Sequence, residues 1–217
     1  IKNIGEGFSP KLEVAYRSFF DFLREAEGII DSPFNIQGEI CVARRGICTH
    51  LVEKQELLHR GCIDSCLSFQ SKIDGYKTVY EPKAVFYEFS PKSIPESFKQ
   101  QTRRAVTLIE SMMAFKGMIL KRKFGAFGML IMPAHFLMLM VLPFVFLGGI
   151  VGMLAVCVLD PSDCLFPAAI GISALATLLS RQLQAFLRIQ LVLAVATFGF
   201  LVGTETQKFE RIQSTRR

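Results

Sequence analysis

The segment FGMLIMPAHFLMLMVLPFVFLGGIVGMLAVCVLD, from Phe127 to Asp160, has no formally charged residue before its last position. A helix rises about 1.5 Å per residue, and roughly 20 apolar residues cross a bilayer. The segment is therefore too long for one perpendicular crossing and short for a hairpin of two. The simplest prediction is a surface-lying or tilted first part, ending near Pro133 or Pro143, followed by one true span.

Two more apolar stretches follow, at residues 165–180 and 189–203, with an amphipathic stretch between them. The chain is 51% hydrophobic, above the usual composition of a soluble domain. If the basic residues 121–123 and the basic tail 205–217 are both cytoplasmic, the number of crossings is even. Three apolar stretches do not fit that rule directly. Either residues 127–160 cross twice, or one stretch does not cross.

The formal net charge is +6, and Lys and Arg gather beside the apolar stretches. This placement indicates contact with membrane lipids, and we expect no nucleic-acid partner. The six cysteines form no CxxC pair, so they predict free thiols in a reducing compartment and no metal site in this chain. The sequence begins at Ile1 without a signal segment, which suggests the tail of a longer protein.

The first 123 residues carry nearly all of the charge and predict alternating helices and short strands. Helices are expected at 11–31, 50–60, 64–74 and from 93 to about 118, and strands at 36–45, 77–80 and 84–87. Within the first strand, Gly38 is a place where a backbone or ligand can come close. Arg44 and Arg45 end that strand, where they either hold a phosphate or carboxylate or are simply solvated.

Four polar residues are candidates for chemistry. Asp64 opens a predicted helix, where a carboxylate serves equally well as an N-cap. Gln100 and Arg103 lie three residues apart, so they share one helix face and together suit a sugar hydroxyl and a diphosphate. His135 lies in the apolar tract, where it is either functional or a hydrogen-bonded packing residue.

In this order, the motifs resemble the second half of a family 2 glycosyltransferase domain of the membrane-embedded, processive kind, such as cellulose, hyaluronan and poly-N-acetylglucosamine synthases. The resemblance covers about residues 12–160. It rests on the run from Gly38 to Arg45, on Asp64 where the family has its catalytic aspartate, and on Gly75-Tyr76 followed by a Pro-x-Ala run. Gln100-x-x-Arg103-Arg104 stands where the family has QxxRW.

The resemblance implies an α/β fold, with part of a GT-A glycosyltransferase domain at residues 1–104. An interfacial helix would follow at 105–126, transmembrane helices at 127–204 and a basic cytoplasmic tail at 205–217. The protein would be multi-pass in the plasma (inner) membrane with its catalytic domain in the cytoplasm. A partner subunit is not identified by the sequence.

The implied activity is inverting transfer of a sugar from a nucleotide-sugar donor to a growing polysaccharide, coupled to export. Asp64 would be the general base. The residues expected to bind donor and acceptor are Gln100, Arg103, Arg104, Gly38 and Arg44. A Mg²⁺ or Mn²⁺ cofactor would be held by a DxD motif upstream of residue 1, so this chain alone is expected to be inactive.

Two departures from the family pattern leave other functions open. Ile63 precedes Asp64 where the family has an acid, and Arg104 replaces the tryptophan of QxxRW. The lost tryptophan suits a single sugar transfer to a polyprenyl phosphate or another lipid. A third reading, from a different class, is a non-enzymatic membrane transport or scaffold protein in which Asp64 is an N-cap.

Overall fold

The computed structural model describes residues 2–4, 8–53, 63–89, 93–159 and 165–203, and 78% of the interpretable part is helical. Its strands are β1 (Lys2–Ile4) and β2 (Tyr87–Phe89), which pair in parallel. The predicted α/β class is wrong, because the described residues contain no sheet core. The segments 36–44 and 77–80, expected to be strands, are loops, since no neighbouring strand among the described residues pairs with them, and Arg45 already begins α2. The strand expected at 84–87 is present only from Tyr87, the first residue of β2.

Most helices of the first half agree with the sequence pattern. The described helices of this half are α1 (Phe8–Ile30), α2 (Arg45–Val52), α4 (Ile63–Ile73) and α5 (Ile94–Ala114). The Ser93 hydroxyl accepts the Glu96 N–H at 3.3 Å and caps α5, as its Ser-x-Pro start predicts. Gly75 has φ +82° and follows the end of α4. The predicted helix at 50–60 begins earlier, at Arg45, and residues 54–60 lie outside the described part.

The apolar tract is one 33-residue helix, Phe127–Leu159, that continues through both prolines. It consists of η3 (Phe127–Ile131), α6 (Met132–Phe136), η4 (Leu137–Val141) and α7 (Leu142–Leu159), of which η3 and η4 are π-helical. A π-helical stretch precedes each proline. In a regular α-helix, the proline ring would clash with a carbonyl group in this preceding turn. The wider π-helical turn relieves the clash, so the helix continues without a break.

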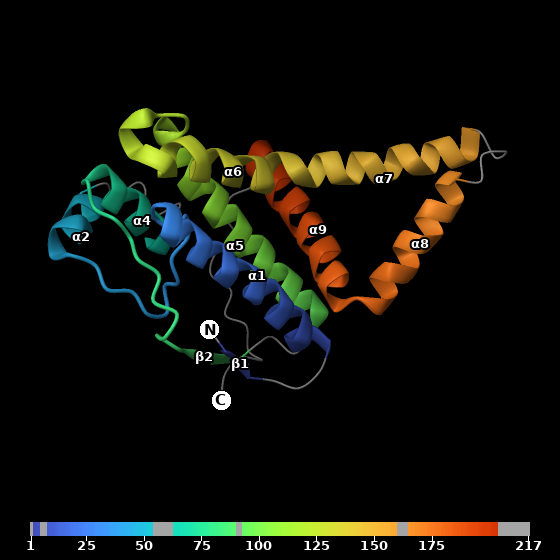
Figure 1. Cartoon of the computed structure of the whole chain (residues 1–217), viewed down its shortest axis with the longest axis horizontal. Helices are drawn as coiled ribbons and strands as arrows, with labels where there is room; N and C mark the ends of the chain where they lie inside the picture. The colour runs from blue at the N-terminus through green and yellow to red at the C-terminus, as the bar shows by residue number, and fades with distance from the viewer. Residues whose placement is uncertain (1, 5–7, 54–62, 90–92, 160–164, 204–217) are drawn as a thin grey trace.

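The chain then continues through α8 (Leu165–Leu179) and α9 (Arg181–Val202). The amphipathic and apolar stretches predicted separately at 181–203 form this single helix α9. By length and composition, the helix Phe127–Leu159 and α9 can each cross a membrane. Figure 1 shows α7 and α8 extending away from the other helices, and α9 returning alongside α5, with which it is in contact.

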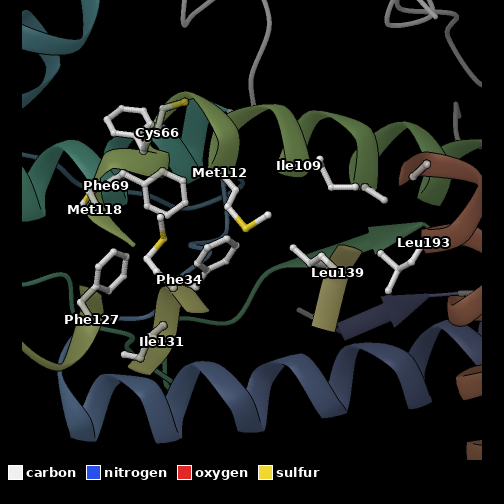
Figure 2. Close-up of a cluster of buried hydrophobic side chains, with 14 of the residues drawn as sticks. Phe34, Cys66, Phe69, Ile109, Met112, Met118, Phe127, Ile131, Leu139 and Leu193 are labelled. Atoms are coloured by element: carbon white, nitrogen blue, oxygen red, sulfur yellow. The ribbon is translucent and has the colours of Figure 1, made fainter. Parts of the chain in front are cut away.

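One hydrophobic core joins the polar helices to the apolar ones. Figure 2 shows Phe34 and Phe69 at its centre, with side chains of α5, the 33-residue helix and α9 around them. Phe34, Phe69, Ile109 and Met132 are all fully buried. Side chains from both sides of the predicted boundaries at residues 104 and 126 therefore meet in the same core.

Two carboxylates at the end of α1 hold the start of the long helix. Asp31 Oδ1 pairs with Lys72 Nζ at 2.5 Å, and Asp31 Oδ2 accepts the Phe127 N–H at 3.1 Å. One turn earlier, Glu27 Oε1 lies 2.5 Å from His135 Nε2. Both carboxylates are buried. Burial raises the pKa of Asp31, but the hydrogen bonds from Lys72 and the Phe127 N–H outweigh it, and the net pKa is lowered.

Candidate functional site

A cavity of about 590 Å³ opens between α1, the loop before α2, α4, α5 and α9. Its polar lining comes from Arg17, Arg24, Asn35, Gln37, Glu39, Asp64, Gln101 and Arg104. Its apolar lining includes Leu108 of α5, Leu139 of η4, and Ile189 and Leu193 of α9. The cavity therefore joins the charged half of the chain to both helices that are long enough to cross a membrane.

Asp64 lies in the first turn of α4 and is half-buried. Its Oδ1 accepts the Ser65 N–H at 3.0 Å, so the carboxylate satisfies a donor at the helix start as well as lining the cavity. Gly38 is packed against it: a Cβ at position 38 would lie 3.0 Å from Asp64 Oδ2. The Ser65 hydroxyl donates to Asn35 Oδ1 at 2.9 Å and fixes the same loop. Only glycine fits this approach without moving the carboxylate.

Helix α5 brings Gln101 and Arg104 to the cavity. These residues are three apart and share one helix face. Gln101 is buried, whereas Arg104 is exposed. The predicted pair Gln100 and Arg103 does not line the cavity. Each of these residues precedes a lining residue by one position, so the pair lies on a neighbouring side of α5. Burial, together with the neighbouring Arg104 charge, lowers the pKa of Arg103.

Arg44 is placed in a second cavity, of about 720 Å³, on the other side of the loop at residues 36–39. It precedes α2 as its N-terminal flanking residue, and its guanidinium lies 4.7 Å from the centre of the Tyr76 ring. The structure thus brings together Gly38, Asp64 and Arg104 among the predicted residues, and separates Arg44 from them.

Two arginines of α1 were not predicted as site residues. Arg17 and Arg24 are seven residues apart on one face of a helix interpreted only as amphipathic, and both line the cavity. Arg24 Nε donates to the Asn35 carbonyl at 2.9 Å, and Nη1 donates to Asp21 at 2.7 Å. Residues seven apart share a helix face, so the spacing of these two arginines was the sequence signal that could have identified them as site residues. With Arg104, three arginines line the cavity together with two acidic residues, Glu39 and Asp64.

The Mg²⁺ or Mn²⁺ ion is expected to bind a DxD motif upstream of residue 1, and in the described part of the chain no group of three or more His, Cys, Asp or Glu side chains could hold a metal ion. Arginines line the cavity, and a guanidinium can bind the phosphate of a ligand bidentately. A half-buried carboxylate, a buried amide and the guanidinium groups of Arg17 and Arg104 together suit a ligand that carries both hydroxyl and phosphate groups. The Arg24 guanidinium is already bonded to Asp21 and Asn35.

No protein-family model, curated protein or solved structure matches this chain.

Proposed function

We propose that this chain is part of a membrane-bound inverting glycosyltransferase, which transfers a sugar from a nucleotide-sugar donor to a hydroxyl group of a growing polysaccharide. The main support is that one cavity is lined by Asp64 of α4 and by Gln101 and Arg104 of α5. The order of sequence motifs described above supports the same activity. The proposal does not need a sheet in this part of the chain, because all three residues are on helices.

In the proposed reaction, the acceptor hydroxyl attacks the anomeric carbon while Asp64 takes its proton. The bond from the anomeric carbon to the nucleoside diphosphate breaks, and its electron pair leaves on the diphosphate oxygen. Attack from the opposite side inverts the anomeric centre. A positioned general base contributes about 10²–10⁴-fold in rate.

The arginines of the cavity have a role in binding and in charge stabilisation. In this proposal, Arg104 and Arg17, which line the cavity, oppose the charge that grows on the leaving diphosphate. Gln101 is buried, so its amide is held in place and suits a sugar hydroxyl. Gly38 allows its loop to close directly over the Asp64 carboxylate.

The two long apolar helices support a membrane location. We propose the plasma (inner) membrane, with several crossings and the cavity on the cytoplasmic side. The three successive cations at residues 121–123 precede the first apolar helix, as the positive-inside rule expects for a cytoplasmic end.

A lipid acceptor is the second candidate. It is favoured by the apolar part of the cavity, where Leu139, Ile189 and Leu193 come from helices able to cross a membrane. A polyprenyl phosphate could place its chain there and its phosphate beside the arginines. Because the acceptor is then used once, product length separates this reaction from polymer synthesis.

The test is nucleoside diphosphate release by the full-length protein in native membranes, over a panel of UDP-, GDP- and dTDP-sugars with Mg²⁺ or Mn²⁺. Release with one donor is expected, and analysis of the product by size then distinguishes a polymer from a single transfer. Folded protein that releases no nucleotide with any donor, with membrane lipids and extracted polysaccharide present as acceptors, would overturn the proposal and favour a transport or scaffold role.

A further inference from the structure

The loop at residues 116–126, between α5 and the long apolar helix, has an unusual combination of side chains. Leu120 is 63% exposed. The next three residues, Lys121, Arg122 and Lys123, are also exposed. An apolar side chain at the surface followed by three cations is the composition of a segment that binds the boundary between lipid head groups and acyl chains.

The backbone holds this loop in a fixed shape. Leu120 has φ +58° and is the one non-glycine residue with positive φ in the described part of the chain. Its N–H donates to the Gly128 carbonyl at 2.9 Å. The loop is pressed against the helix start, because a Cβ on Gly128 would lie 2.7 Å from the Lys121 carbonyl oxygen. Met118 and Phe127 anchor its two ends in the core. Leu120 is thus held outward by a well-defined turn.

The exposed side of the helix that follows is apolar. While Ile131, Met132, His135 and Leu139 face the protein and are buried, the exposed residues of the same stretch are Met129, Leu130, Ala134, Leu137 and Val141. They recur at helical spacing and form one outward stripe. The surface suited to hydrocarbon therefore begins at Met129, directly beside the cationic loop.

We propose that residues 120–123 bind anionic lipids: Leu120 inserts among the acyl chains, and the three cations contact lipid phosphates. Charge complementarity selects this partner, because a bilayer leaflet with anionic lipids attracts Lys and Arg near its surface. The loop also adjoins the start of the apolar stripe, which places it at the depth where lipid head groups meet acyl chains. The inference rests on membrane crossing by the long helix and is independent of glycosyl transfer.

The 217 residues contain no tryptophan, so a single substitution adds one indole to this part of the protein. Tryptophans elsewhere in the full-length protein are replaced by phenylalanine, so that the added indole is the only fluorescent reporter. The test compares L120W with V42W, because Val42 lies in the loop before α2 and is 97% exposed. Each full-length variant is placed in nanodiscs of phosphatidylcholine with phosphatidylglycerol, and one of the two lipids carries bromine on its acyl chains. M129W, beside the loop, is a second reporter if L120W does not fold.

The expected result is a blue-shifted L120W emission that brominated lipid quenches, with V42W unaffected. At equal bromine content, brominated phosphatidylglycerol should quench more strongly than brominated phosphatidylcholine. The K121Q/R122Q/K123Q background should remove this difference, and K121Q alone should lower the local enrichment of anionic lipid by up to about fivefold. Equal quenching by the two lipids, or an indole at position 120 or 129 as accessible to aqueous quencher as in V42W, would overturn the proposal.

Discussion

Among single residues, the contact between Gly38 and Asp64 makes the sharpest steric demand on the cavity. In a Gly38→Ala variant, the new Cβ would lie 3.0 Å from Asp64 Oδ2, so the carboxylate must shift. Since small misplacements of catalytic groups cost up to about 10²-fold, we expect a roughly ten- to hundredfold loss of transfer rate. Stability should change little, because position 38 is exposed. A wild-type rate of nucleotide release would contradict this placement of Asp64.

The two neighbouring glutamines of α5 provide a matched pair of variants. Gln101 is buried and lines the cavity, whereas Gln100 does not line it. We expect Gln101→Ala to lower kcat/KM for the donor about tenfold or more, which corresponds to losing one hydrogen bond to the substrate. Gln100→Ala should leave kcat/KM near the wild-type value. Equal losses in both variants, or a loss confined to Gln100→Ala, would show that the other helix face binds the substrate.

Part of this cavity lining was predicted from the sequence, but the rotation of α5 was not. Asp64, Gly38 and Arg104 were predicted, and the structure places them around one cavity. The choice between Gln100 and Gln101 depends on which side of α5 faces α4 and α9, and a helical repeat alone does not contain that information. Arg17 and Arg24 were missed for a similar reason, since their role depends on the loop at residues 35–39 lying across α1.

Between elements, Asp31 links α1 to α4 through Lys72 and to the long helix through the Phe127 N–H. We expect Asp31→Asn to lower the free energy of unfolding by about 1–3 kcal/mol at neutral pH, because Lys72 and the amide lose a charged acceptor. The pKa of Asp31 is lowered below its ordinary value of 3.8. This contribution is therefore present above that pH and is lost as the pH falls through the folded-state pKa.

The measurement for this link is unfolding of both proteins in detergent across a pH series. The difference in stability between wild type and Asp31→Asn should be largest near neutral pH and should shrink below about pH 3.8. A difference that stays constant down to low pH would mean that the Asp31 charge does not stabilise the junction.

Helices were predicted more reliably than strands, for a physical reason. The α5 start is determined locally by Ser93 and Pro95, so its capping hydrogen bond could be expected from the sequence. A strand requires a partner with unpaired backbone groups, and residues 36–45 have none in the described part of the chain. The prolines of the long helix were also misleading as boundaries, because π-helical turns accommodate both of them.

For the whole molecule, the central feature is a core shared by polar and apolar helices. Phe69 of α4 is fully buried and lies near Phe34, Phe115 and Phe127. We expect Phe69→Ala to cost about 3–5 kcal/mol. The polar and apolar helices should then unfold at the same lower temperature, observed by circular dichroism and by protease cleavage in both halves. Loss of the polar half alone, with the apolar helices unchanged, would contradict a shared core.

The most direct test of the proposed activity is the rate of nucleoside diphosphate release by full-length Asp64→Asn protein in membranes. Asp64 lies inside the first turn of α4, where its Oδ1 accepts the Ser65 N–H, and the amide oxygen of asparagine can accept the same bond. Folding should therefore be preserved, and an unchanged thermal midpoint is the control. We predict a loss of about 10²–10⁴-fold in rate with donor binding retained, as expected when a general base is removed. A folded Asp64→Asn protein that transfers sugar at the wild-type rate would contradict the assignment of this cavity as the site of transfer.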